Sequence, residues 1–128
     1  MASATPSDRL YSESHEWHKA EGDTVTLGLT SFAVEQLTDV TYVQMKPKGT
    51  KLKGGDAVGE VESVKTTSDV YSAVAGEIIE VNAAAVEDPS LLNSDPYGKG
   101  WLLKIRVSDK AGLSSLMDAA KYDATYHA

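Results

Sequence analysis

The stretch ESVKTTSDVYSAVAGE, residues 62–77, decides the fold prediction, because it consists of two strand-like runs that meet at Lys65. Tight hairpin turns usually contain Asn-Gly or Asp-Gly, since these residues adopt positive φ at low cost. No Gly or Pro stands beside Lys65. The pattern therefore predicts a β-hairpin with a long, flexible amine at its tip, and it leaves open why a lysine occupies that place.

Strand-like segments continue on both sides of this hairpin. Residues 24–30 alternate apolar and polar side chains, as a half-buried strand does. Turn signals at Gly54-Gly55-Asp56 and at Ala75-Gly76 flank the hairpin, and Gly54 and Gly76 are equally far from Lys65 along the chain. Many short strands separated by turns predict a mainly β domain, a sandwich or flattened barrel. The other strand-like segments lie at 39–45, 57–64, 77–82 and 101–107.

Helices are predicted at three places from capping residues and apolar spacing. Residues 31–37 form the first, with Ser31 as its N-cap. A helical turn begins at Asp88-Pro89, because Asp caps well and Pro suits the first helical position. The last helix starts behind Ser108 or Asp109, shows apolar residues at helical spacing, and packs on the β domain.

Length and composition exclude several classes of protein. A chain of 128 residues suits one domain, which we place at 10–124, between a flexible N-terminal tail at 1–9 and a C-terminal tail at 125–128. The net charge of -7 argues against a nucleic-acid partner, because phosphate binding needs clustered Lys and Arg. The absence of cysteine excludes disulfide scaffolds, Cys-ligated zinc and thiol catalysis.

Targeting signals are equally scarce. No apolar run reaches the length of a membrane span, and the first residues lack the apolar core of a secretory signal. Only Arg9 is basic before Tyr11, which does not suit a mitochondrial presequence. We therefore expect a monomeric cytoplasmic protein with no membrane partner.

The histidines and the remaining polar residues predict no catalytic or metal site. His15 and His18 are three positions apart, whereas the helical zinc motif needs histidines four apart, so surface or rim positions are the favoured interpretation. His127 lies in the C-terminal tail. The sequence contains no G-x-S-x-G elbow and no Gly-rich phosphate loop. An enzyme is not expected.

Lys65 has two interpretations. On the residues alone, a solvated loop lysine is favoured, because most lysines are exposed. The alternative is a modification site, since a lysine on a rigid hairpin with small or polar neighbours is accessible to a modifying enzyme. Acylation would remove its charge.

A resemblance decides between them. The residues ESVKTTSDVYSAVAGEIIEVN resemble the lipoyl-attachment hairpin of the H protein family of the glycine cleavage system. HEW at 15–17, EGDTVTLGLT at 21–30 and LNSDPYGKGWLLKI at 92–105 are also similar to that family, in the same order and spacing. The similarity extends from Tyr11 to Tyr122 and includes the last helix.

The resemblance implies a fold, a cofactor and partners. The fold would be the hammerhead type of lipoyl carrier, with two antiparallel sheets, short helices and a C-terminal helix. Lipoate would be amide-bonded to Lys65, and a non-catalytic shuttle would carry the aminomethyl group of glycine between enzymes. The implied partners are the pyridoxal-phosphate glycine decarboxylase (P protein), the folate-dependent aminomethyltransferase (T protein), dihydrolipoamide dehydrogenase (L protein) and a lipoylating enzyme.

The resemblance also assigns two acidic residues to a cleft that receives the loaded arm. These are Glu16 and Asp69, and a carboxylate beside a protonated amine forms a charge-assisted hydrogen bond. The alternative for both is an ordinary solvated carboxylate.

Some positions depart from the family pattern. Thr38 stands where the family usually has Gly, Gln44 and Lys46 stand where it has acidic residues, and Ser31-Phe32 replaces an acidic helix start. These departures concern partner docking rather than the arm. Lipoyl domains of 2-oxoacid dehydrogenases are shorter and lack the similarity at both ends, and biotin carriers flank their lysine with Met.

Overall fold

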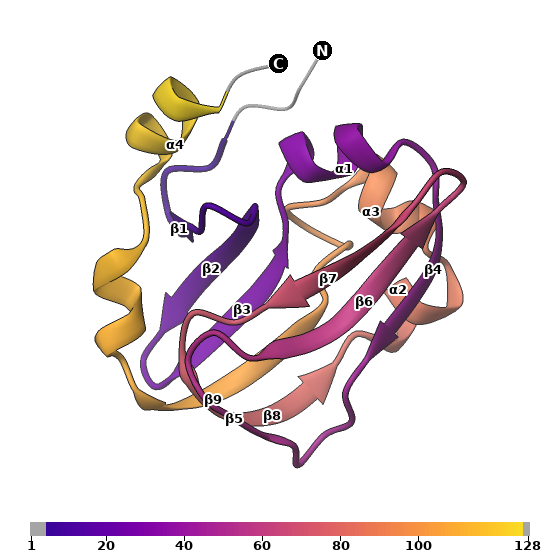
Figure 1. The fold of residues 1–128 in the computed structure, drawn as a ribbon. Helices are drawn as coiled ribbons and strands as arrows, with labels where there is room; N and C mark the ends of the chain where they lie inside the picture. The colour runs from indigo at the N-terminus through magenta and orange to yellow at the C-terminus, as the bar shows by residue number, and fades with distance from the viewer. Residues whose placement is uncertain (1–4, 127–128) are drawn as a thin grey trace.

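The computed structural model describes residues 5–126, which form two antiparallel sheets (Figure 1). The larger sheet has six strands in the order β1-β2-β3-β9-β8-β5, and the smaller has the order β4-β6-β7. This confirms the predicted mainly β architecture of two antiparallel sheets. The strands are β1 Leu10–Tyr11, β2 Glu16–Glu21, β3 Thr24–Leu29, β4 Val40–Met45, β5 Lys51–Leu52, β6 Ala57–Ser63, β7 Thr67–Tyr71, β8 Ala75–Val81 and β9 Leu103–Asp109.

Short helices lie at two places around the sheets. Helices α1, α2 and α3 lie near the β6–β7 tip in Figure 1, whereas α4 lies beside β1 on the other side of the view. A 3₁₀ helix, η1, precedes α4. The helices are α1 Ser31–Leu37, α2 Ala83–Glu87, α3 Ser90–Ser94, η1 Ala111–Ser115 and α4 Ala119–Thr125.

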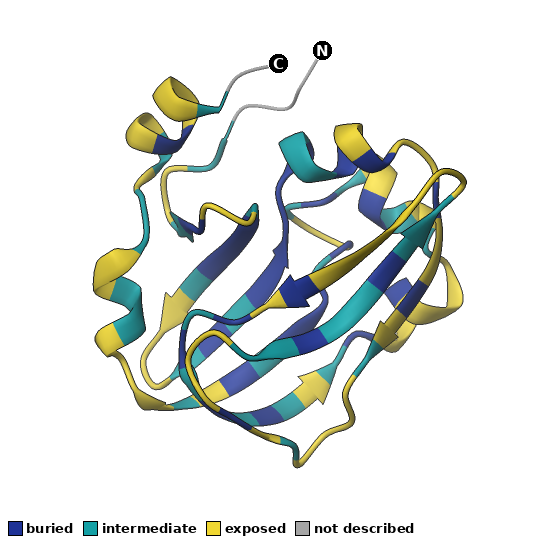
Figure 2. Cartoon of the chain, viewed as in Figure 1, coloured by how far each residue is buried: buried dark blue, intermediate teal, exposed yellow. Residues whose placement is uncertain are grey.

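One apolar core joins the two sheets. Buried residues recur along the strands of both sheets, whereas exposed residues dominate the turns (Figure 2). This follows from the alternation of side chains along a strand, which sends every second residue inward. The larger sheet contributes Val25, Leu27, Ile78 and Ile105, and the smaller sheet contributes Val43, Val61 and Val70.

A second, aromatic cluster holds the C-terminal segment against the sheet. Tyr11, Trp17 and Tyr122 are all buried, and the rings of Tyr11 and Tyr122 stack with centroids 5.0 Å apart. Trp17 pairs with Gly28 across the β2–β3 ladder, where a Cβ would lie 2.6 Å from the indole ring. The indole N–H donates to the Pro96 carbonyl at 3.0 Å.

The predicted turn at Ala75-Gly76 is wrong, because both residues belong to β8. Gly76 serves a close approach between strands: a Cβ there would lie 2.1 Å from the Arg106 carbonyl oxygen of β9. The two turns predicted at equal distances from Lys65 are therefore not both present. The turn at Gly54-Gly55 is, with positive φ at Gly55, whereas Gly76 lies within a strand.

Helix 31–37 is confirmed, but its N-cap is Thr30 rather than Ser31. The Thr30 hydroxyl accepts from the Ala33 amide at 3.2 Å, and Thr30 is extended, as a capping residue is. The helix buries Ser31, Val34 and Leu37. Ser31 had the right residue type, but its side chain contacts Tyr97 instead.

The two later helices also differ from prediction. The turn predicted at Asp88-Pro89 becomes α3, which begins at Ser90. A C-terminal helix is present as α4, but its predicted start is wrong, because Ser108 and Asp109 end β9 and the segment divides into η1 and α4. Between them Met117 bridges to Tyr11 of β1, so sheet pairing interrupts the helix.

No helix in the described part of the chain is long and apolar enough to cross a membrane. His127 lies outside the described residues. The division into tails at 1–9 and 125–128 and a domain at 10–124 stays a prediction.

Candidate functional site

Lys65 lies in the turn between β6 and β7, which pair as an antiparallel hairpin that ends at Glu62 opposite Thr67. Its side chain is exposed. Among the described residues, its Nζ forms neither a hydrogen bond nor an ion pair. The structure therefore places a free amine at the end of a strand pair that is anchored in the core through Val61 and Val70.

The hairpin tip, residues 63–66, closes without glycine because Ser63 supplies the missing hydrogen bonds. The Ser63 hydroxyl accepts from the amides of Lys65 and Thr66 at 3.2 and 3.1 Å. The Ser63 amide donates to the Thr66 carbonyl at 2.8 Å. Sequence reasoning missed this residue, although serine is known to close turns in this way.

The tip is also attached to the loop between α1 and β4. The Val64 amide donates to the Asp39 carbonyl at 3.2 Å, while the Val64 side chain is 68% exposed. Asn93 of α3 supports that loop, because its side chain accepts from the Val40 amide and donates to the Thr38 carbonyl. The backbone of the tip is thus held in place, and its side chains extend into solvent.

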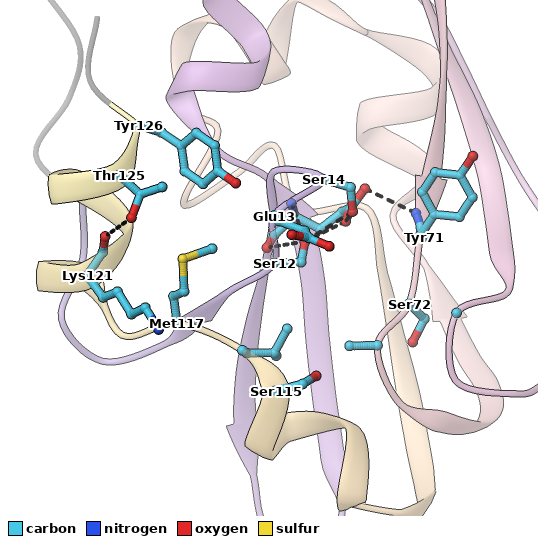
Figure 3. A pocket seen from close by; sticks show the side chains of 14 residues that line it. Ser12, Glu13, Ser14, Tyr71, Ser72, Ser115, Met117, Lys121, Thr125 and Tyr126 are labelled. Carbon is cyan, nitrogen blue, oxygen red and sulfur yellow. Dashed lines mark hydrogen bonds between the residues drawn. The ribbon is translucent and has the colours of Figure 1, made fainter.

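A cleft of about 490 Å³ lies at the other end of β7 (Figure 3). We call it the Glu16 cleft. In Figure 3 the segment 12–14 lies between Tyr71 on one side and the side chains of α4 on the other. Its lining residues are Ser12, Glu13, Ser14, Glu16, Gly55, Tyr71, Ser72, Ala73, Ser115, Leu116, Met117, Lys121, Thr125 and Tyr126.

Glu16 is the buried acidic group of this cleft, with only 1% of its surface exposed, whereas Glu13 is exposed. Oε1 accepts from the hydroxyls of Ser12 and Ser14 at 2.6 and 2.5 Å, and Oε2 accepts from the Tyr71 amide at 3.2 Å. Burial raises the pKa of Glu16 above its ordinary value, and these hydrogen bonds offset part of the shift. An ordinary solvated carboxylate is therefore excluded at this position.

Glu16 keeps some capacity to bind a further donor. Each carboxylate oxygen has two lone pairs, and Oε2 uses one of them on Tyr71. A buried carboxylate with a free lone pair favours a positively charged donor, because a charge-assisted hydrogen bond strengthens where water is excluded. The cleft is thus suited to an ammonium group.

His18 is fully buried, so the predicted surface or rim position is wrong for this residue. Its Nε2 accepts from the Ala73 amide at 3.1 Å, which requires the neutral ring. Burial lowers the pKa of His18 to about 4, and the Glu16 carbonyl opposes that shift only in part. His15, by contrast, is half-buried, and its Nδ1 lies 2.7 Å from the Tyr122 hydroxyl.

Glu16 and His18 act together on the end of the hairpin. They are two residues apart on β2, so their side chains share one face. Glu16 accepts a hydrogen bond from the Tyr71 amide and His18 accepts one from the Ala73 amide, and these two donors are also two residues apart. Two side chains of the larger sheet therefore supply the hydrogen-bond acceptors that a neighbouring strand would otherwise offer to the end of β7 and the residues after it.

Asp69 lies elsewhere. It is exposed on β7, directly opposite Glu60 of β6, and does not line the Glu16 cleft. Its carboxylate lies 3.4 Å from the Tyr71 hydroxyl, so Tyr71 contacts both acids: Glu16 through its backbone and Asp69 through its side chain. The structure does not bring the two carboxylates into one site directly.

Lys65 and Tyr71 mark the two ends of this arrangement. Six residues of extended chain span about 20 Å. A group that joins the hairpin tip to the Glu16 cleft must follow most of the length of β7. Among the described residues, no group of three or more His, Asp or Glu side chains could hold a metal ion.

Comparison with known proteins shows the family to which the chain belongs. The family model described as glycine cleavage H-protein matches residues 9–128. The chain belongs to the glycine cleavage H-protein family. Proteins of this family are non-catalytic carriers with a lipoyl group attached covalently to a lysine, and they interact with other components of the glycine cleavage system.

Individual relatives agree along nearly the whole chain. A glycine cleavage system H protein of Thermus thermophilus is 49% identical over 117 residues, 91% of each chain. One from Marinobacter nauticus is 46% identical over 121 residues, 94% of this chain and 93% of the relative. The crystal structure of a glycine cleavage system H protein from Mycobacterium marinum has a TM-score of 0.87, with 41% identity over 94% of this chain and 98% of that one.

Family membership confirms the resemblance, the non-catalytic role and the lipoyl cofactor. The protein is a lipoyl-bearing shuttle. The residues present fit such a group: the tip offers an exposed amine that can form an amide bond, and the cleft beside the same hairpin offers a desolvated carboxylate.

Proposed function

We propose that Lys65 is the lysine that carries the lipoyl group. The observation that supports this most strongly is the exposed Lys65 side chain at the end of a hairpin whose backbone is fixed by Ser63 and Asp39. A carrier needs both properties. The amine must reach a modifying enzyme, and the base of the arm must stay fixed so that the arm searches a limited volume at high effective concentration.

The finer roles follow the family. The attached lipoyl group supplies a dithiolane that takes up the aminomethyl group of glycine and is later reoxidised. The partners are then the P protein, the T protein and the L protein, together with a lipoylating enzyme. The cytoplasm is the proposed compartment, as the acidic, cysteine-free composition favours.

Glu16 is the residue that we assign to the positively charged end of the loaded arm. Oε2 has a free lone pair in a site where the donors of Ser12, Ser14 and Tyr71 already fix the carboxylate. Asp69 stays a prediction as a second acidic residue, and its contact with the Tyr71 hydroxyl supports an indirect role.

The test is exchange between bicarbonate and the glycine carboxyl, catalysed by the P protein. Lipoylated wild-type protein should stimulate this exchange, whereas unlipoylated protein and the Lys65→Arg variant should not. Arg keeps the positive charge but cannot replace the amine as a nucleophile. The protein alone should not turn over glycine.

Other outcomes would contradict the proposal in distinct ways. Equal stimulation by lipoylated and unlipoylated protein would indicate a structural adaptor. Acylation by a 2-oxoacid dehydrogenase, without any response to glycine, would indicate a lipoyl domain of that class. Exchange supported by Lys65→Arg would assign the arm to another residue.

A further inference from the structure

The hairpin tip contains a hydroxyl whose hydrogen-bonding capacity is fully used. The Ser63 hydroxyl accepts from the Lys65 and Thr66 amides and donates to the Thr66 carbonyl at 3.2 Å. A serine hydroxyl has one proton and two lone pairs, so all three are engaged. Both amides that follow Val64 in the turn therefore have the same partner.

Within the described residues, the turn has one further internal hydrogen bond, from the Ser63 amide to the Thr66 carbonyl at 2.8 Å. The backbone of the tip is joined to the rest of the protein by the pairing of Ser63 with Val40 of β4 and by the Val64 amide, which donates to the Asp39 carbonyl. The turn contains neither Gly nor Pro, so no residue restricts its backbone to a turn by itself. Among the side chains of the described residues, the Ser63 hydroxyl is the group that accepts from the Lys65 and Thr66 amides.

We propose that Ser63 is a positioning residue for the attachment reaction, because its hydroxyl preforms the turn that the attaching enzyme must recognise. This rests on the proposed assignment of the lipoyl group to Lys65. In that reaction the Lys65 ammonium first loses a proton. Its Nζ then attacks the carbonyl carbon of an acyl adenylate, the class of activated acid that ATP provides. An amide bond forms, the second proton goes to solvent, and the phosphate oxygen leaves with the electron pair.

A preformed turn changes the affinity of this encounter rather than its chemistry. When only a fraction of the molecules holds the binding-competent turn, the apparent dissociation constant rises by the inverse of that fraction. The bound enzyme still imposes the correct turn on the variant. We therefore expect Ser63→Ala to raise the KM for the protein substrate about tenfold, which corresponds to about 1.4 kcal/mol, and to leave kcat unchanged.

The experiment measures lipoylation rates with a lipoate ligase supplied with lipoate and ATP, well below the unfolding temperature of each variant. The variants are Ser63→Ala, Ser63→Thr and Ser68→Ala. Ser63→Thr keeps the hydroxyl and should restore a KM within twofold of wild type. Ser68 is an exposed serine on the same hairpin, outside the turn, so Ser68→Ala is the matched control and should also stay within twofold.

Amide hydrogen exchange gives an independent measurement. The amides of Lys65 and Thr66 should exchange faster in Ser63→Ala and at the wild-type rate in Ser63→Thr. Faster exchange with an unchanged KM would overturn the proposal, because the turn would be loosened without consequence. A fall in kcat alone, or a failure of Ser63→Thr to restore KM, would overturn it as well.

Peptide mapping of the wild-type product separates this inference from the assignment on which it rests. A lipoyl group found on a lysine other than Lys65 would refute the assignment. A lipoyl group on Lys65 with equal KM values for all variants would refute only the role of Ser63.

Discussion

The hairpin tip and the Glu16 cleft lie at opposite ends of β7 and are built in opposite ways. At the tip, the backbone is held by Ser63 and Asp39, while the side chains of Val64 and Lys65 are exposed. In the cleft, the Glu16 side chain is buried, and hydroxyl and amide donors fix its carboxylate. Substitutions at the tip should therefore alter modification, and substitutions at the cleft should alter stability.

The largest effect on stability is expected for Glu16→Ala. The change removes the carboxylate that accepts from the Ser12 hydroxyl and from the part-buried Tyr71 amide, and Ser12 retains the longer contact with the backbone carbonyl of position 16 at 3.3 Å; a buried donor left unsatisfied costs about 1–3 kcal/mol. We expect the free energy of unfolding to fall by about 3 kcal/mol, measured by urea denaturation. Glu13→Ala is the control, because Glu13 is exposed on the same segment. Equal effects for the two variants would remove the distinction between buried and solvated acids in the cleft.

A pH dependence should follow from His18. Burial depresses its pKa from 6.5 to about 4, so the stability that it contributes is complete above 6.5 and is lost as the pH falls towards 4. Between pH 7.5 and pH 5 the loss is about 2 kcal/mol. His18→Gln keeps an acceptor for the Ala73 amide but does not titrate. The difference in unfolding free energy between wild type and this variant should therefore change with pH by that amount, and a constant difference would contradict the neutral buried ring.

Glu16 should contribute in the opposite direction. Its folded-state pKa is raised, so its ionised form is disfavoured in the folded protein. The resulting loss of stability is absent below 4.5 and is complete once the pH has risen through the folded-state value. Comparison of His18→Gln with wild type cancels this contribution, since both proteins retain Glu16.

A smaller effect is expected for Thr38→Gly, in the loop that supports the tip. Thr38 has φ 66 and ψ -131, a backbone conformation that residues other than Gly rarely adopt. Relief of this strain, less the greater flexibility of Gly in the unfolded chain, should stabilise the protein by about 1 kcal/mol. Asp39→Gly serves as the control, since Asp39 has no positive φ, and it should be destabilising. A loss of stability in Thr38→Gly would show that the loop is not strained there.

The smallest effect is expected for Lys65→Arg. The side chain is exposed and has no partner among the described residues, so the free energy of unfolding should stay within about 0.5 kcal/mol of wild type. Denaturation of both proteins under the same conditions measures this. A loss above about 1 kcal/mol would mean that Lys65 stabilises the hairpin and does more than present an amine.

The sequence predicted those elements whose signal is local and periodic. Helix 31–37 and the strand at 24–30 were recognisable because alternation or capping residues define them within the segment itself. Gly76 misled the prediction, because its missing Cβ serves a contact with β9 that is distant in the sequence. The C-terminal helix was overextended for a similar reason, since the bridge from Met117 to Tyr11 interrupts it.

The residues of the candidate site also differ in whether a local sequence signal or a contact between distant segments determines their position. The exposed position of Lys65 was predictable from its hairpin, whereas its assignment as the attachment residue came from the family resemblance and stays a proposal. The burial of Glu16 and His18 was not predictable from the sequence. It depends on hydrogen bonds from the amides of Tyr71 and Ala73, which lie far from these residues along the chain. Ser63 could have been recognised, since a serine two residues before a turn amide is a known local signal.

Intact mass and peptide mapping of protein made in lipoate-replete cells test the central claim most directly. The wild type should carry one lipoyl increment, and it should map to the peptide that contains Lys65. The Lys65→Arg variant should fold normally and carry none. A lipoyl increment on another peptide, or one that persists in Lys65→Arg, would contradict the account.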